Sequence, residues 1–189
     1  MTSCVTTEIE CNVSTSLVNT QYTEEVSTSN QLVGKWDLYY HLPYDKKWDL
    51  SSYTAIMKDI DTVDKLVAIQ TSLPEIAIKQ CMLFFMRGGV TPRWEDPANK
   101  NGGCFSFKVI NKFVLSVWKT LFYSVGGETL FIEPKYNHLI TGITISPKKN
   151  FCIIKVWMEN CSIQDPQIII NIPNLVKQGC LFRKHEAEF

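Results

Sequence analysis

The sequence predicts an α+β fold in which a curved antiparallel β-sheet carries helices on one face. Three observations lead to this class. Segments with the alternation and aromatic content of strands open the folded part of the 189-residue chain. Segments with helical spacing are interspersed among the later strands. Residues 140–146 and 151–158 flank Pro147-Lys148-Lys149-Asn150, a hairpin signal that makes two neighbouring strands antiparallel.

Seven segments are predicted to be strands. The first, residues 35–41, alternates and is rich in aromatic side chains, and residues 78–86 form an apolar run that is typical of a buried strand. The others are residues 53–58, 104–110, 140–146, 151–158 and a short segment at 180–183.

Three further segments are predicted to be helical. The first starts at Asp61-Thr62 and continues at helical spacing through Val63, Leu66, Val67 and Gln70. The second covers residues 111–125, with a cap at Asn111 and an end at Gly126-Gly127. The third begins at Asp165-Pro166 and stops at Gly179, with Pro173 expected to kink it.

The chain divides into a tail and one domain. Residues 1–30 are rich in Ser and Thr and contain one aromatic residue, Tyr22. Such a segment cannot bury enough apolar surface to offset its ordering entropy, so a flexible tail is predicted, with docking on the body as the alternative. Residues 31–189 are predicted to form a single domain.

The composition narrows the functional classes. Nineteen basic and nineteen acidic side chains cancel, which argues against a protein that coats nucleic acid through bulk charge. A nucleic-acid ligand would therefore be held locally, in a pocket. Seven cysteines without a C-x-x-C spacing favour free thiols in a reducing compartment, and Cys81 and Cys152 are expected to be buried and inert. With no signal peptide or membrane-spanning run, a soluble, cytoplasmic protein is expected.

A search for catalytic chemistry finds no recognisable motif. The three histidines, His41, His138 and His185, are scattered, and no metal-ligand spacing, phosphate-binding loop or nucleophile motif is present. A cysteine nucleophile with a distant histidine stays open as a minority alternative. The sequence therefore predicts no catalysis, no cofactor and no metal site.

The tryptophans provide the strongest functional signal. Trp36 and Trp118 fit core positions of a strand and a helix, whereas Trp48 and Trp94 lie in polar loops. A loop tryptophan either folds back onto the body or contacts a ligand. The loop sequence Pro92-Arg93-Trp94-Glu95-Asp96 is closed by Asn99-Lys100-Asn101-Gly102-Gly103.

With these loops, the chain resembles the eukaryotic cap-binding translation initiation factor 4E family over roughly residues 32–160. The other matching pieces are Trp36-Asp37-Leu38-Tyr39-Tyr40, Asp61-Thr62-Val63, Trp118 to Glu128 and Ile154-Lys155-Val156-Trp157. The resemblance implies helices on the convex face of the sheet and a pocket for the 7-methylguanosine cap of mRNA on the concave face. It also implies a role in translation initiation.

By this resemblance, Trp48 and Trp94 would stack on the two faces of the methylated base, since indole is the best cation–π partner. Glu95 would accept hydrogen bonds from guanine N1–H and the exocyclic amine, and a solvated loop acid is its alternative. Trp157 matches the aromatic residue that touches the N7 methyl group, although a core strand position is a serious alternative.

The expected phosphate contacts depart from the family pattern. Cys104, Lys148 and Ile153 stand where the family usually has a basic residue, an arginine and a lysine. Lys155 points to the same strand face as Trp157 because side chains alternate. Lys148 and Lys155 are predicted to contact phosphates, with Lys149 and Arg93 as reserves, and solvated surface charges are the alternative.

The surface that binds partner proteins in the family also differs in this sequence. Val67 stands where the family has a helix tryptophan that holds a peptide of the scaffold factor 4G or of repressors, and Lys119-Thr120 replaces a leucine-glutamate pair. Leu32 and Val63 remain. Three functions therefore stay open: a cap-binding module in initiation, a cap-binding competitor or repressor, and a protein-interaction module with a degenerate pocket.

Overall fold

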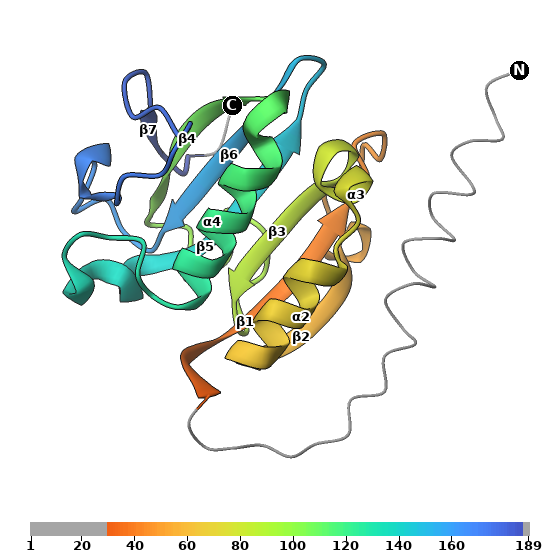
Figure 1. The fold of residues 1–189 in the computed structure, drawn as a ribbon, viewed down its shortest axis with the longest axis horizontal. Helices are drawn as coiled ribbons and strands as arrows, with labels where there is room; N and C mark the ends of the chain where they lie inside the picture. Colours follow the sequence, from red (N-terminus) through yellow and green to blue (C-terminus); the bar gives the residue numbers. More distant parts are fainter. Residues whose placement is uncertain (1–29, 187–189) are drawn as a thin grey trace, which may run out of the picture.

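The computed structural model describes residues 30–186, so the predicted tail, residues 1–30, lies outside the described part except for Asn30. Within that part the chain forms one curved sheet with helices on one side, as the sequence predicts (Figure 1).

All strand pairs in the sheet are antiparallel, and the strand order is β2-β1-β3-β5-β6-β4-β7. The seven strands are β1 (Gln31–His41), β2 (Thr54–Thr62), β3 (Met82–Arg87), β4 (Gly103–Ile110), β5 (Ile140–Pro147), β6 (Phe151–Met158) and β7 (Leu181–Lys184). The predicted hairpin is present between β5 and β6, where Lys148 N–H bonds to Phe151 O at 2.8 Å.

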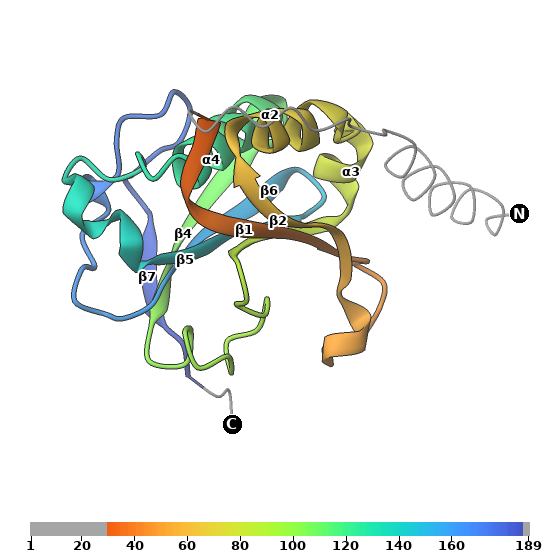
Figure 2. The ribbon, with the colours of Figure 1, turned by 90° about the horizontal axis from the view of Figure 1, so that it is seen from below.

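Three helices cover the convex face of the sheet, and two long loops project from the opposite, concave face (Figure 2). The helices are α2 (Val63–Ser72), α3 (Glu75–Gln80) and α4 (Val114–Gly126). Thr62 caps α2 by accepting a hydrogen bond from Lys65 N–H, as the predicted helix start requires. Gly126 allows α2 and α4 to approach closely, since a Cβ there would lie 2.7 Å from Leu66 Cδ1.

The main core lies between the helices and the sheet. Trp36 and Trp118 are fully buried in it, as predicted. Trp36 stacks on Phe85 with ring centroids 4.9 Å apart, and Phe85 stacks on Phe122 of α4. This packing joins the sheet to α4.

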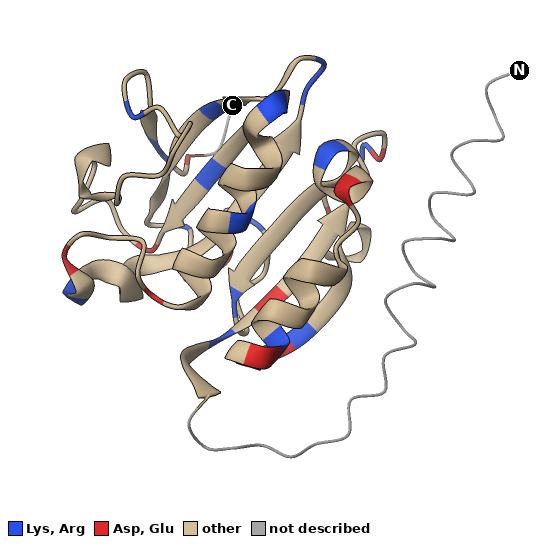
Figure 3. Cartoon of the chain, in the orientation of Figure 1, with Lys and Arg blue, Asp and Glu red and all other residues tan. Residues whose placement is uncertain are grey.

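Strand alternation divides the two faces. In β6 the side chains of Cys152, Ile154 and Val156 are buried on the helix side, while the alternate residues point to the concave face. On the helix side, α2 and α3 each carry acidic and basic residues, whereas α4 carries a basic residue and no acidic one (Figure 3). The concave face presents the alternate strand residues, which are not used to pack the helices.

Two secondary-structure predictions are wrong. Residues 78–86 are not one strand, because Glu75–Gln80 form α3 and β3 begins only at Met82. Residues 165–179 do not form a long helix. Asp165 does cap a turn by accepting from Gln167 N–H, but the 3₁₀ turn ends at Ile168. The predicted start of the second helix also shifts, since Asn111–Phe113 form a 3₁₀ turn before α4.

The two cysteines predicted to be inert lie in the described part of the chain. Cys81 and Cys152 are buried and free, and burial raises the pKa of both thiols, as their predicted inert character requires. Between residues 30 and 186, none of the helices combines the length and the hydropathy needed to cross a bilayer.

Candidate functional site

A pocket of about 300 Å³ opens on the concave face beneath the two long loops. Its walls come from the β1–β2 connection, the β3–β4 connection and strands β3, β5 and β6. The lining residues are Trp48, Tyr53, Met82, Phe84, Arg93, Trp94, Glu95, Thr144, Ser146, Lys155 and Trp157. The structure thus brings together six of the predicted site residues: Trp48, Trp94, Glu95, Trp157, Lys155 and Arg93.

Trp48 and Trp94 are exposed although they are large and apolar. Their exposed fractions are 51% and 38%, whereas Trp36 and Trp118 are at 0%. Both loop rings border the same pocket, so neither folds back into the core. Exposed indoles that line one cavity are available to a planar ligand.

Trp48 is held in place by His41, a fully buried residue at the end of β1. The two rings are stacked with centroids 4.3 Å apart and an interplanar angle of 2°. Nε2 of His41 also lies 2.8 Å from the carbonyl oxygen of Lys47, which fixes the residue before Trp48. This contact supports one face of the indole and leaves the rest of the ring to the pocket.

The β3–β4 connection, residues 88–102, carries Trp94 and Glu95 and is called the recognition loop below. Asp96 accepts hydrogen bonds from Thr91 N–H, the Thr91 hydroxyl and Ala98 N–H at 2.7–2.9 Å. The side-chain amide of Asn99, which is fully buried, donates to Arg93 O at 2.8 Å and to Thr91 O at 3.3 Å. The loop is therefore ordered by its own polar side chains.

Internal hydrogen bonds also set the charge of Asp96. Burial alone would raise the pKa of its carboxyl group, but the bonds from Thr91 and Ala98 outweigh burial and lower the pKa below its usual value. Asp96 is therefore a charged anchor at neutral pH.

Glu95 forms an ion pair with Arg93, whose Nη2 lies 2.7 Å from Glu95 Oε1. Their side chains are 43% and 29% exposed, respectively, so water screens this pair. The hydrogen bond from Arg93 lowers the pKa of Glu95, which keeps the carboxylate charged and able to accept hydrogen bonds.

Trp157 closes the pocket on the sheet side. It is 8% exposed and lies outside the main core, in a small cluster with Phe84, Met86, Val90 and Cys104. Its Nε1–H donates to the Thr144 hydroxyl at 3.2 Å. It is thus both a strand residue that packs and a residue that lines the pocket, and its contact with a methyl group stays a prediction.

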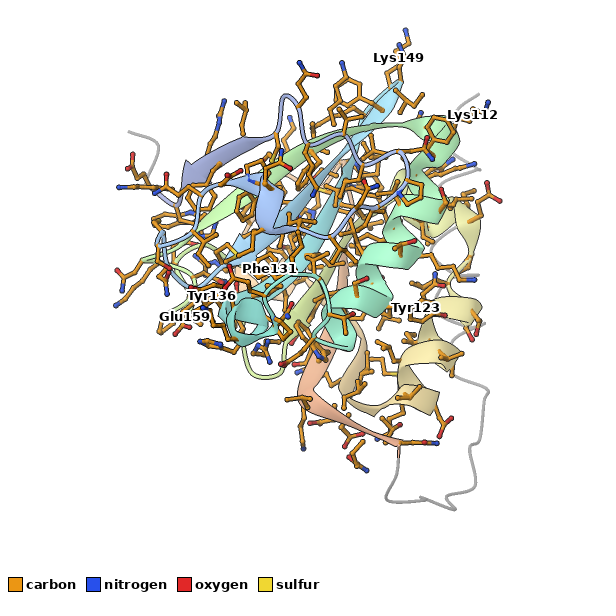
Figure 4. All side chains as sticks on the ribbon, turned by 60° about the vertical axis from the view of Figure 1, so that its left-hand side comes forward. Lys112, Tyr123, Phe131, Tyr136, Lys149 and Glu159 are labelled. Atoms are coloured by element: carbon orange, nitrogen blue, oxygen red, sulfur yellow. The ribbon has the colours of Figure 1, made fainter. Side chains whose placement is uncertain are left out.

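The predicted phosphate ligands lie at different distances from the pocket. Lys155 lines it, as its shared face with Trp157 predicts. Lys148 and Lys149 are exposed in the β5–β6 turn and are not among the lining residues, and Figure 4 shows Lys149 projecting from the hairpin tip. Cys104, which stands where the family usually has a basic residue, is buried beside Trp157 and offers no charge to a phosphate.

The predicted partner residues lie on the convex side. Val63 and Val67 are 44% and 42% exposed on α2, and Lys119 is exposed on α4, which packs against α2. Leu32 lies near the start of β1 and packs partly on the main core.

Sequence reasoning missed several lining residues, including Tyr53, Met82, Phe84, Thr144 and Ser146. The signal that could have found Thr144 and Ser146 is alternation, because two polar residues two positions apart in an apolar strand share its concave face. Burial raises the pKa of Tyr53 to about 12, so its hydroxyl stays neutral. His41 and His185 also contact pocket tryptophans, and no local pattern marks them.

This arrangement defines a class of protein, a binding module for a flat heterocycle that carries an anionic group. Two exposed indoles, one ionised carboxylate and a lysine converge on one cavity, and the described residues contain no cluster of His, Cys, Asp or Glu suited to a metal ion. The chain belongs to the eukaryotic initiation factor 4E family, whose sequence model matches residues 31–188.

Among its relatives, eukaryotic translation initiation factor 4E of Candida albicans is 27% identical over 149 residues, which are 73% of this chain and 68% of the relative. Factor 4E-2 of Schizosaccharomyces pombe is 28% identical, over 72% of this chain and 57% of its own length. The homologue of Acanthamoeba polyphaga mimivirus is 35% identical over 52% of this chain and 35% of its own length.

Solved structures support the same fold. A schistosome eIF4E complexed with m7GpppG and 4E-BP has a TM-score of 0.63 and 20% identity, covering 72% of this chain and 75% of that chain. Ascaris suum eIF4E-3 with m7G cap has a TM-score of 0.61 and 18% identity, covering 70% and 75%.

Proposed function

We propose that this protein binds the 7-methylguanosine cap at the 5′ end of mRNA and acts without catalysis in translation initiation, in the cytoplasm. The observation that carries the proposal is the pair of exposed tryptophans, Trp48 and Trp94, that border one pocket beside the ionised Glu95. Family membership and the cap analogues bound to solved relatives support it.

Trp48 and Trp94 stack on the two faces of the base in this proposal. Methylation at N7 places a delocalised positive charge on the purine, and each indole face contributes about 0.5–2 kcal/mol of cation–π attraction. Stacking itself contributes roughly 1–3 kcal/mol per base. Unmethylated guanine keeps the stacking and loses the cation–π attraction, so the pocket discriminates by charge.

Glu95 selects guanine. Its carboxylate accepts from N1–H and the exocyclic amine, two donors that adenine does not present together. Arg93 holds the same carboxylate in the free protein, so the base shares or replaces that bond. Trp157, 8% exposed and fixed through Thr144, forms the wall that meets the methyl group.

Lys155 is the principal phosphate ligand, because it is the predicted lysine that lines the pocket. Lys148 and Lys149 meet the more distal phosphates from the β5–β6 turn. Arg93 reaches a phosphate only when it leaves Glu95.

The deciding experiment is a fluorescence titration with 7-methylguanosine triphosphate and with unmethylated GTP. Because stacking quenches indole emission, the methylated ligand should quench strongly and bind more tightly. Trp94→Ala should abolish tight binding, while Ile132→Ala, an exposed residue away from the pocket, should bind like the wild type. A flat titration of the wild-type protein would favour an interaction module with a degenerate pocket.

A second function, a cap-binding competitor or repressor, is favoured by one observation on the convex face. Val67 is a small exposed residue beside Val63, and the exposed Lys119 faces solvent on the adjacent helix, where a peptide anchor would be needed. The schistosome and Caenorhabditis elegans relatives were solved with 4E-binding proteins. A pull-down from lysate on immobilised cap separates the two roles, because co-purified scaffold factor supports initiation and its absence supports competition.

A further inference from the structure

His185 lies where the C-terminal strand, the recognition loop and the pocket meet. It follows β7, which pairs with β4. Its backbone N–H donates to Gly102 O at 2.9 Å, and its ring Nδ1 lies 2.9 Å from Asn99 O. The ring also contacts Trp157, with centroids 4.8 Å apart and an interplanar angle of 59°. One side chain therefore touches both the recognition loop and the sheet-side wall of the pocket.

Through Asn99, His185 is connected to the loop backbone next to Trp94 and Glu95. The backbone carbonyl of Asn99 accepts from His185, while its buried side-chain amide donates to the carbonyl oxygens of Arg93 and Thr91. Arg93 directly precedes Trp94 and pairs with Glu95. Displacement of Asn99 would thus be transmitted to the backbone that aims Trp94 and Glu95.

A carbonyl oxygen only accepts hydrogen bonds, so the contact with Asn99 places a ring proton on Nδ1 of His185. Burial lowers the pKa of His185, the Asn99 bond opposes this shift, and the charge of Lys155 adds to it. Lys155 of β6 is the charged residue that acts on the ring, and the charged residues next in sequence to the contacting groups are Lys184 and Glu186 beside His185 and Lys100 beside Asn99. At neutral pH the ring is a neutral donor.

We propose that His185 is a positioning residue, which locks the recognition loop through Asn99 and braces Trp157 for contact with the N7-methylated base. This inference rests on the proposed function, since its readout is cap affinity. It adds a C-terminal clamp to the pocket, made by a residue that follows β7 and is not among the lining residues of the pocket.

Two substitutions separate the two contacts. His185→Phe keeps a ring against Trp157 and removes the donor to Asn99. Its affinity for methylated and unmethylated ligand should fall together, by about fivefold, because the carbonyl of Asn99 loses its partner and the loop loosens. His185→Asn keeps an N–H near the position of Nδ1 and removes the ring. Its preference for the methylated ligand should fall by about threefold, with the affinity for GTP nearly unchanged.

A pH series gives a readout that a purely structural role would not move. Protonated His185 adds a positive charge near Lys155 and the cationic base, so the wild-type preference for 7-methylguanosine triphosphate over GTP should fall as the pH drops through the lowered pKa of His185. The attraction of that charge for the phosphates is common to both ligands. His185→Asn cannot titrate there and should lack this component. Titration of the ligand phosphates is common to both proteins and cancels in the comparison.

The outcomes distinguish the two proposals. If the wild type binds no cap nucleotide, the proposed function is wrong. Val176→Ala, which changes an exposed residue outside the pocket, is the control. If the wild type binds, and if both His185 variants equal the wild type and this control in affinity, methyl preference and pH profile, the clamp is wrong, whatever the melting temperatures of the variants. Amide hydrogen exchange over residues 88–102 should rise in His185→Phe, and unchanged exchange would also overturn the clamp.

Discussion

Replacing Glu95 with glutamine tests the carboxylate as the guanine-selecting group. The substitution keeps the size of the side chain and one acceptor oxygen, but it removes the charge and turns the other oxygen into a donor. That donor would face a donor of guanine. One of two charge-assisted hydrogen bonds is therefore lost, while the stacking between Trp48 and Trp94 is retained.

The size of the effect follows from these bonds and from the state of the free protein. A hydrogen bond to a charged group contributes about 1.5–3 kcal/mol, which corresponds to about tenfold to hundredfold in affinity. In the free protein, Arg93 already bonds to Oε1 of Glu95, and part of that interaction is given up on binding. Because both side chains are partly exposed, water screens the pair and the correction is small. We therefore expect a loss of about tenfold to hundredfold.

The assay is a quenching titration with 7-methylguanosine triphosphate and with 7-methylinosine triphosphate, which lacks the exocyclic amine. The wild type should prefer the guanosine ligand, and Glu95→Gln should show a smaller preference. Glu133→Gln, which removes an exposed acid away from the pocket, serves as the matched control. Equal affinity of Glu95→Gln and wild type for the guanosine ligand, or an unchanged preference over inosine, would refute the assignment.

The pH dependence adds a second check on Glu95. Its pKa is lowered below the usual value by the hydrogen bond from Arg93, so the carboxylate stays charged as the pH falls from 7 to about 5. The difference in affinity between wild type and Glu95→Gln should persist over that interval. It should shrink only when the pH falls through the lowered pKa and the carboxyl group takes up its proton.

Three further predictions concern other parts of the molecule. Lys155→Gln should weaken binding of capped RNA and reduce the slope of log affinity against log salt by about one, as measured by titration at several salt concentrations. Asp96→Asn should lower the free energy of unfolding by about 1–3 kcal/mol in denaturant melts at neutral pH. Because hydrogen bonds lower the pKa of Asp96, this difference should vanish as the pH falls through that pKa. Val67→Trp should strengthen binding of a helical scaffold peptide by about tenfold or more in a peptide titration, because a buried tryptophan anchor contributes at least about 2 kcal/mol.

The sheet could be predicted from the sequence because its strands carry strong local patterns. Residues 140–146 and 151–158 match β5 and β6 closely, since the turn at 147–150 and the alternation in each strand point to the same pairing. The prediction of one strand at residues 78–86 is wrong because a buried helix and a buried strand have the same apolar composition, and only Pro74 marks the start of α3.

The prediction of a helix at residues 165–179 is wrong for a different reason. Asp165-Pro166 starts a helical turn as its residue types favour, but the chain then pairs with residues 130–132. Ile132 N–H bonds to Ile168 O, Ile170 N–H bonds to Leu130 O, and Phe131 forms a bridge with Ile169. Tertiary hydrogen bonds and β-branched residues outweigh the local helix signal.

In the site, too, residues with a local sequence signal could be predicted, whereas residues that depend on distant contacts could not. Trp48 and Trp94 could be singled out because large aromatics in polar loops are locally anomalous, and Glu95 because its loop resembles that of the family. His41 and His185 could not, because each acts through a contact that only the fold creates. His185 lies 86 residues from its partner Asn99, and a histidine that bonds to a backbone carbonyl has no sequence signature.

Under the proposed function, these supports offset part of what the pocket lacks at Cys104 and Ile153, where the family usually has basic residues. Ordering side chains and loops opposes binding, by about 0.5–1.5 kcal/mol for each side chain that is immobilised. Here the stack on His41 orders Trp48, and the bonds of Asp96 and Asn99 order the recognition loop before any ligand arrives. An ordered Trp48 and an ordered recognition loop lose less entropy on binding, which offsets part of the attraction that the absent phosphate contacts would have supplied. The affinity of this chain should therefore depend more on the base, and less on the number of phosphates, than the affinity of a relative whose pocket has the full set of basic residues.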